Sequence, residues 1–250
     1  MSDTSLTAAE LRALGTQRLV GRILSPIWVP ACVLIMKFGF GWRMDGMEEA
    51  RRVFAGARGS SRGPILVCGN HLTMVDSFII AWALAGTSHY LRDCGSLPWN
   101  TPERENFAST WWKRALVYLM KCVPVERGGD RREVGAVLRK LVHLMRRGEV
   151  ALVFPEGGRS RLSRVDTDAV TYGVGRIVKA LPRCRVVCVY MRGAGQETWS
   201  ALPKRGERFR VQAQAFEPKS DHRGMRGSLD ISRQILGRLA EMERRHFDGR

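Results

Sequence analysis

A histidine and an aspartate five positions apart, His71 and Asp76, are residues whose types could perform chemistry together. An imidazole can take a proton from a hydroxyl at neutral pH, and a carboxylate bonded to its other nitrogen would stabilise the imidazolium. Residues five apart do not face each other on a straight helix, so the pairing requires His71 on a loop and Asp76 in the first turn of a helix. The spacing indicates a general base, but alone it does not fix the reaction.

A second segment, Val153 to Arg161, has the composition of an anion-binding loop. Gly157 and Gly158 allow backbone N–H groups to approach an anion, and Arg159 suits bidentate contact with a phosphate. The alternative is an ordinary glycine-rich turn with solvated arginines. We expect a phosphate-binding loop here.

The order of the strands and helices that must position these segments predicts an α/β fold, with a mostly parallel central sheet flanked by helices. From Pro64 onward, short β-rich runs alternate with helical ones. The predicted strands are Ile65 to Cys68, His89 to Arg92, Lys121 to Val125, Val150 to Phe154, Arg185 to Tyr190 and Phe209 to Phe216. The predicted helices are Val75 to Leu84, Arg104 to Leu119, Arg131 to Arg147, Thr171 to Ala180 and Leu229 to His246. The apolar stripe of the last helix predicts a docking face against the domain.

The N-terminal part, residues 1–57, is predicted to be a helical membrane-associated element before a catalytic domain at residues 64–250. A capping-box pattern at Thr7 to Glu10 starts a helix. The apolar segment Ile23 to Trp42 falls short of the roughly 20 clean apolar residues of a membrane span, because it contains Pro26, Pro30 and Lys37. We therefore expect a helix pair that lies in or dips into one leaflet, with a buried core helix as the alternative.

Composition limits the partners and the compartment. The 41 Lys and Arg residues exceed the 24 Asp and Glu residues, which gives a net charge of +17 and calls for an anionic partner. A basic module that binds anionic membranes or nucleic acid without catalysis would also explain this charge, but no nucleic-acid-binding signature is apparent, so nucleic acid is not expected as a partner. The six cysteines form no C-x-x-C pair, and no secretory signal is apparent. We expect reduced thiols, no metal site and a location on the cytoplasmic face of the membrane.

Four segments occur in an order that resembles the signature blocks of a known family. They are Asn70-His71-x-x-x-x-Asp76, Val123-Pro124-Val125-Glu126-Arg127, Phe154-Pro155-Glu156-Gly157-x-Arg159-Ser160 and the apolar run Val186 to Tyr190. Together they resemble the glycerolipid acyltransferases, best known for the 1-acylglycerol-3-phosphate (lysophosphatidic acid) acyltransferases.

The resemblance implies roles for residues of these blocks. His71 would be the general base on the acceptor hydroxyl, and Asp76 would orient it. Residues of the same blocks would bind the substrate, chiefly its phosphate: Asn70, Arg127, Glu156, Gly157, Gly158 and Arg159. The acyl donor would be acyl-CoA or an acidic acyl carrier protein, with no further cofactor, and an N-terminal element would dock on membrane lipids.

The chain also departs from the family pattern, and the departures bear on the acceptor. Gly158 stands where a threonine is usual, and Cys188 stands roughly where the fourth block has a proline. The segment Met191 to Trp199 matches no familiar pattern. Lysophosphatidic acid is the expected acceptor, while another lysophospholipid, a lyso-ornithine lipid or a polyene-type metabolite remain alternatives.

Overall fold

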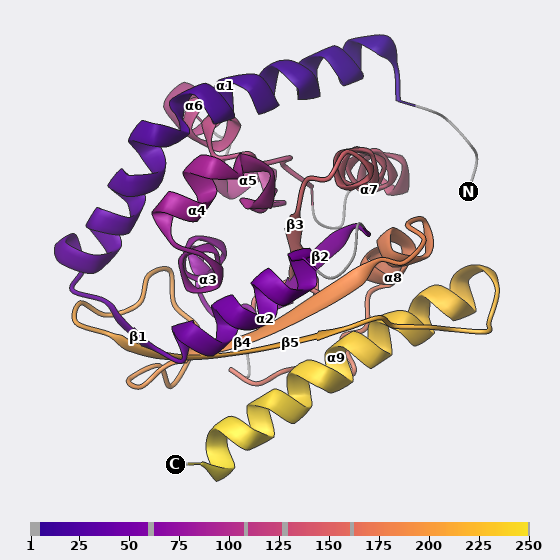
Figure 1. Cartoon of the computed structure of the whole chain (residues 1–250). Coiled ribbons are helices and arrows are strands. Elements are labelled where there is room, and N and C mark those ends of the chain that lie inside the picture. Colours follow the sequence, from indigo (N-terminus) through magenta and orange to yellow (C-terminus); the bar gives the residue numbers. More distant parts are fainter. Residues whose placement is uncertain (1–5, 60–62, 108–109, 127–129, 161–162, 250) are drawn as a thin grey trace.

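The computed structural model describes residues 6–59, 63–107, 110–126, 130–160 and 163–249, and a five-stranded sheet lies at the centre of these residues (Figure 1). The strands are β1 (Arg43–Asp45), β2 (Ile65–Gly69), β3 (Ala151–Val153), β4 (Arg185–Gly193) and β5 (Arg208–Phe216), in the order β1-β5-β4-β2-β3. β2 pairs in parallel with β3 and β4, β1 pairs in parallel with β5, and β4 pairs antiparallel with β5. The predicted mostly parallel α/β sheet is confirmed.

Helices cover both faces of the sheet (Figure 1). They are α1 (Ala8–Leu34), α2 (Met47–Gly59), α3 (Asp76–Leu84), α4 (Thr87–Arg92), α5 (Arg104–Phe107), α6 (Trp111–Leu119), α7 (Arg131–Arg146), α8 (Tyr172–Lys179) and α9 (Gly224–Asp248), with a π-helical turn at Ile35–Gly39 and a 3-10 turn at Cys94–Ser96. One apolar cluster joins the sheet to α2, α3 and α4, and a second joins it to α7, α8 and α9.

Strand β2 shows why the sheet is covered on both sides. All five of its residues are buried. Ile65 and Val67 belong to the cluster with α2 and α3, whereas Leu66 and Cys68 belong to the cluster on the opposite face. A continuous apolar run is typical of a parallel strand between two helical layers, because alternate side chains enter two cores.

The C-terminal helix α9 packs on the sheet through its apolar stripe, as predicted. Ile231, Ile235, Leu239 and Met242 are all buried. Helix α8 approaches α9 so closely that a Cβ atom added at Gly175 would lie 1.9 Å from the Ser228 carbonyl oxygen. The contact between the two helices therefore requires glycine at this position.

The predicted N-terminal helix pair is wrong, because α1 is one helix that continues through both prolines. Pro26 has no N–H to donate to the Arg22 carbonyl, and the Ser25 hydroxyl donates to that oxygen instead, at 2.8 Å. Through this continuity the segment Ala8–Gly39 is long and apolar enough to cross a membrane, by length and composition alone. The same helix packs one side on the domain, and its buried residues are Leu14, Gln17, Gly21, Ser25 and Val29.

Residues just after this helix join the sheet and its core. Residues 43–57 contribute β1 and most of α2, and Ala50 and Phe54 are buried against the sheet. The predicted N-terminal element thus supplies one edge strand and one covering helix in addition to α1.

Three further predictions are corrected. His89 to Arg92 lies in helix α4, not in a strand. Tyr90 is the buried residue of this helix, so the segment lacks the alternating buried side chains of a strand. Lys121 to Val125 makes isolated bridges to Asn100 and Glu103, since Pro102 and Pro124 lack the N–H groups that a continuous ladder needs. Arg104 to Leu119 is divided into α5 and α6.

Candidate active site

His71 and Asp76 meet at the carboxyl end of β2. The strand ends at Gly69, His71 lies on the following loop, and Asp76 is the first residue of α3. The Nδ1 atom of His71 lies 3.1 Å from Oδ2 of Asp76. The loop-and-first-turn arrangement is the one that the sequence required, and it leaves Nε2 as the imidazole nitrogen that can face a substrate.

The carboxylate of Asp76 is held by the loop that precedes its helix. Its Oδ2 atom also accepts hydrogen bonds from the backbone N–H groups of Leu72, at 2.6 Å, and Thr73, at 2.7 Å. The Thr73 hydroxyl donates to Oδ1 at 2.5 Å. Asp76 is 2% exposed, so this buried acceptor is matched by converging donors and can orient the imidazole with little freedom to move.

The third sequence block packs directly against the histidine. The ring of Phe154, just beyond β3, stacks on the imidazole with centroids 3.9 Å apart and planes 11° apart. The backbone N–H of Ser160 donates to the His71 carbonyl at 3.0 Å. These contacts bring the predicted anion-binding loop beside the predicted base. Phe154 and Thr73 act on the site although the sequence prediction assigned them no role, and both lie inside or next to the blocks that were recognised.

Asn70 joins the same loop to β4. Its Nδ2 group donates to the Met191 carbonyl at 2.9 Å, and its Oδ1 atom accepts from the Met191 N–H at 2.8 Å. Both polar groups of the amide are engaged in this exchange. The geometry therefore favours a positioning role for Asn70 at the strand end.

The predicted anion-binding loop turns at Gly157 and contains Arg159. Gly157 has φ of +71°, and a Cβ atom there would lie 2.9 Å from the Thr171 methyl group, so glycine is needed on both counts. The guanidinium of Arg159 lies over the Trp199 ring, 4.9 Å from its centroid. Trp199 comes from the segment that matched no familiar pattern, and no sequence signal identified it.

That segment runs beside the histidine loop. The Ser200 N–H donates to the Leu72 carbonyl at 3.1 Å, and the Met74 N–H donates to the Ala201 carbonyl at 3.1 Å. Trp199 is 45% exposed, directly before this contact. The tryptophan that contacts the Arg159 guanidinium therefore lies directly before the residues that pair with the histidine loop.

Glu156 faces the interior behind the loop. Burial raises the pKa of Glu156 to about 7, with additional raising by the charges of Asp166 and Glu243 and partial lowering by the backbone N–H groups of Asp166 and His71. Its Oε2 atom accepts from the Asp166 N–H at 3.3 Å. Within the described residues Oε1 is buried and has no hydrogen-bond partner, which suits a carboxyl group that is partly protonated near neutral pH.

The remaining predicted positions are located as follows. Arg127 and Arg161 lie outside the described residues. Gly158 and Arg159 are half-buried in the loop, and Cys188 is buried in the middle of β4, where its neighbours pair with both β2 and β5. Among the described residues, no group of three or more His, Cys, Asp or Glu side chains could hold a metal ion.

A family model described as Acyltransferase matches residues 43–192, which is more than half of the chain. The matched range contains the His71 loop, the predicted anion-binding loop, strands β1 to β3 and all of β4 except its last residue. No curated protein matches the chain.

Proposed function

The chain belongs to the acyltransferase family, and from that premise we propose that it transfers a fatty acyl group from a thioester to the hydroxyl of a lyso-glycerophospholipid. The acceptor that we propose is lysophosphatidic acid, with phosphatidic acid as the product. The observation that carries the proposal is the buried His71–Asp76 pair, stacked against the loop that presents Arg159.

In the proposed reaction Nε2 of His71 takes the proton of the acceptor hydroxyl as its oxygen attacks the thioester carbon. Asp76 stabilises the imidazolium through Nδ1. The carbon–oxygen bond forms, the carbon–sulfur bond breaks, and the departing thiolate takes the proton back from His71. Nucleophile activation of this kind requires no covalent acyl-enzyme.

The acceptor phosphate would rest on the loop after β3. Arg159 offers a guanidinium that lies over the Trp199 ring. The Gly157 N–H already donates to the Phe154 carbonyl at 3.1 Å, so the N–H of Gly158 is the backbone donor that we propose. Arg127, which the family resemblance assigns to the same phosphate, is proposed as a second cation. Gly158 supplies no hydroxyl, so the loop relies on backbone and guanidinium donors.

The acyl donor is proposed to be acyl-CoA or an acidic acyl carrier protein. Both carry negative charge, and the chain has a net charge of +17. Electrostatic attraction of this size raises the association rate more than it fixes the choice of partner.

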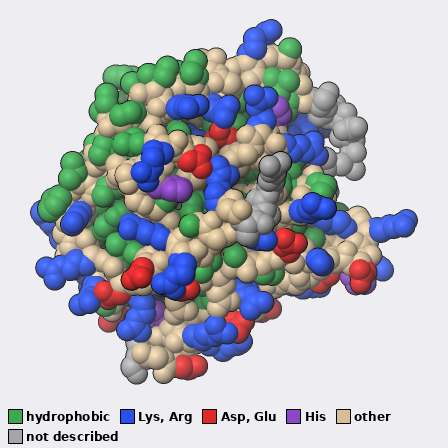
Figure 2. Space-filling model, in the orientation of Figure 1, with side chains coloured by type: hydrophobic (Ala, Val, Ile, Leu, Met, Phe, Trp, Pro, Cys, Tyr) green, Lys and Arg blue, Asp and Glu red, His purple; other side chains and the backbone are tan. Residues whose placement is uncertain are grey.

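Membrane docking is proposed through the outer side of α1 and the start of α6. Leu19, Ile23 and Ile27 of α1 are 57%, 64% and 70% exposed, and Trp111 of α6 is 81% exposed. Figure 2 shows hydrophobic side chains gathered along the upper left margin, where Figure 1 places α1 and α6. Tryptophan favours the boundary between water and lipid. We propose that this side rests on the cytoplasmic face of the membrane.

The direct test replaces His71 with alanine. We expect transfer to fall to background, because the base is absent, while the far-ultraviolet circular dichroism and the unfolding midpoint stay close to those of the unchanged protein. His222 is exposed and remote in the sequence from the recognised blocks, so His222→Ala is the matched control. Substantial activity in folded His71→Ala protein would overturn the mechanism.

The acceptor is tested separately. Purified protein would be incubated with lysophosphatidic acid, other lysophospholipids, a lyso-ornithine lipid and a hydroxylated polyene, each with acyl-CoA and with acyl carrier protein. Mass spectrometry then identifies the products. We expect phosphatidic acid to dominate, and preferential acylation of an acceptor without phosphate would reassign the substrate.

A further inference from the structure

A basic cavity lies at the end of the sheet opposite to His71. Its volume is about 270 Å³. Gly148 and Glu149, directly before β3, line it, so it adjoins the amino end of that strand, whereas His71 follows the carboxyl end of β2. Six cations line the cavity: Arg18, Arg22, Arg58, Arg92, Lys121 and Arg147.

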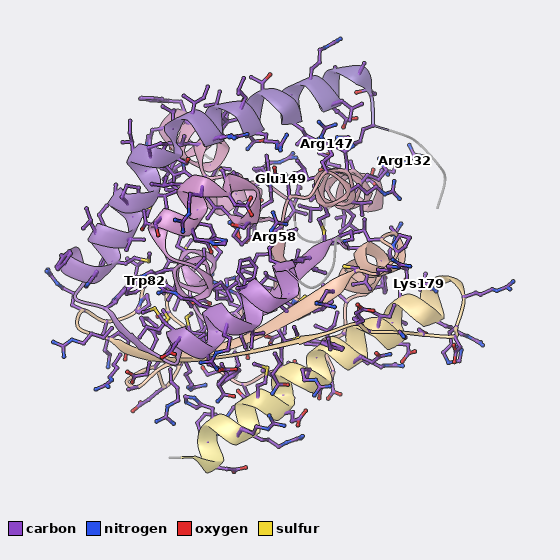
Figure 3. The ribbon with its side chains drawn as sticks, viewed as in Figure 1. Arg58, Trp82, Arg132, Arg147, Glu149 and Lys179 are labelled. Atoms are coloured by element: carbon purple, nitrogen blue, oxygen red, sulfur yellow. The ribbon has the colours of Figure 1, made fainter. Side chains whose placement is uncertain are left out.

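The cavity is assembled from several elements beneath α1. Arg18 and Arg22 come from α1, Arg58 from the end of α2, Arg92 from the end of α4 and Arg147 from the C-cap of α7. Figure 3 labels Arg58, Arg147 and Glu149, which lie between α1 and the sheet, and Figure 2 shows Lys and Arg side chains around a few acidic ones in this region.

Two carboxylates line the cavity, and both are already paired. Glu149 is 2% exposed. Its carboxylate forms an ion pair with the Lys121 ammonium group at 2.7 Å, accepts a hydrogen bond from the Trp99 indole at 2.9 Å and also pairs with Arg18. Asp93 accepts from Arg58 at 3.0 to 3.3 Å.

Burial alone would raise the pKa of Glu149. The charge of Lys121 and the hydrogen bonds that Lys121, Trp99 and Arg18 donate outweigh this effect, so the pKa of Glu149 lies below its ordinary value. The carboxylate is therefore ionised and committed to these partners, and it offers little compensation to further cations.

Three guanidinium groups remain. Arg22, Arg92 and Arg147 have no hydrogen-bonding or ion-pairing partner for their side chains among the described residues. They come from three different elements and converge on one cavity. Unpaired guanidinium groups that line one cavity repel one another, so an anion that enters the cavity stabilises the arrangement.

We propose that this cavity is a second anion site, separate from the catalytic one, which binds a phosphate group through Arg22, Arg92 and Arg147. Guanidinium groups match phosphate oxygens bidentately, and three of them suit a dianion. The phosphate can come from an anionic phospholipid headgroup or from a soluble phosphate ester. The lipid source rests on the proposed membrane docking, because Arg22 lies on α1 next to the exposed Ile23.

The experiment uses a variant in which all three residues are replaced, Arg22→Gln, Arg92→Gln and Arg147→Gln. Its matched control is Arg226→Gln, Arg233→Gln and Arg244→Gln, which removes the same charge from exposed positions of α9. Both are built on an Arg159→Gln background, so that the catalytic loop contributes less phosphate binding. Inorganic phosphate is titrated by calorimetry and by its effect on the unfolding temperature.

We expect the cavity variant to bind phosphate at least about tenfold more weakly than the background protein and the α9 control to stay within about twofold. Without phosphate the cavity variant should unfold no earlier than the control, because unpaired like charges have been removed. If the glutamine variant fails to fold, the corresponding lysine variant keeps the charge and loses the bidentate geometry, and it should show weakened phosphate binding. Equal phosphate affinity in the cavity variant and the control would overturn the proposal.

Vesicle pelleting then distinguishes the two sources. Vesicles of phosphatidylcholine with and without phosphatidic acid are used. A larger loss of binding to the anionic vesicles in the cavity variant than in the α9 control assigns the site to lipid headgroups. Equal loss on vesicles, with phosphate binding lost only in the cavity variant, assigns it to a soluble phosphate ester. Both readouts are independent of acyl transfer, so they stand or fall separately from the catalytic proposal.

Discussion

Asp76 combines two tasks that substitution can separate. Asparagine keeps an oxygen for the loop donors and loses the negative charge that stabilises imidazolium, so we expect Asp76→Asn to lower kcat about 10³-fold or more at nearly unchanged stability. Asp76→Ala also leaves the buried N–H groups of Leu72 and Thr73 unpaired, which costs on the order of 3 kcal/mol. Steady-state kinetics and urea unfolding of both variants check this. Equal stability of the two variants would contradict it.

Glu156 should make the stability of the folded protein depend on pH. Burial raises its pKa from 4.5 to about 7, so the folded state holds the proton more tightly than the unfolded chain. The resulting stabilisation is fully present below pH 4.5 and is lost as the pH rises to about 7, a change on the order of 3 kcal/mol.

Replacement by glutamine removes this ionisation. We therefore expect Glu156→Gln to have a smaller loss of unfolding free energy between pH 5 and pH 8 than the unchanged protein. Urea unfolding at the two pH values measures the difference. Glu241 is partly exposed and pairs with Arg245, and Glu241→Gln is the control that should leave the pH dependence unchanged. Identical pH profiles for the unchanged protein and Glu156→Gln would contradict the assignment.

At the residue scale the local contacts could be predicted and the distant ones could not. His71 and Asp76 are joined by one short loop, so their contact could be predicted from their spacing in the sequence. The stacking of Arg159 on Trp199 joins residues from separate turns, and an aromatic residue in an unfamiliar segment gives no sign of its partner. The same limit applies to the cavity beneath α1, whose cations are dispersed along the sequence.

At the scale of elements, α1 has two different sides that a substitution can test. Ile27 is 70% exposed on α1, and Met225 is 64% exposed on α9, across the sheet. If α1 rests on the membrane, Ile27→Gln should weaken vesicle binding by about tenfold, from loss of apolar burial in lipid. Met225→Gln should leave it unchanged. Vesicle pelleting measures both, and equal effects would contradict docking through α1.

The elements themselves were predictable where the pattern was long and regular. The buried parallel strands and the amphipathic α7 and α9 gave clear periodicity. α1 differed, because the effect of Pro26 depends on whether another donor replaces its missing N–H, and here the hydroxyl of Ser25 does so. The strand predicted at His89 to Arg92 proved to be part of α4. These four residues contain one buried side chain, Tyr90, which gives too little periodicity to distinguish a helix from a strand.

At the scale of the whole molecule, the sheet depends on residues beyond the matched family range. β1 pairs with β5, and β5 in turn pairs with β4. We expect a fragment of residues 43–192 to be insoluble or unfolded, because β1 loses its partner and one face of the sheet loses α9. A fragment of residues 43–250 keeps these contacts and should retain more native circular dichroism. A soluble, folded 43–192 fragment would contradict this dependence.

The strand order has a consequence for folding during synthesis. The region that family comparison recognises, residues 43–192, ends within β4, and the strand that anchors its first residues to the sheet is made later in the chain. The range that the family model matches is therefore shorter than the range of residues that forms the sheet. During synthesis β1 must wait for β5 to leave the ribosome, so the fold closes only after every recognised catalytic block has already been translated.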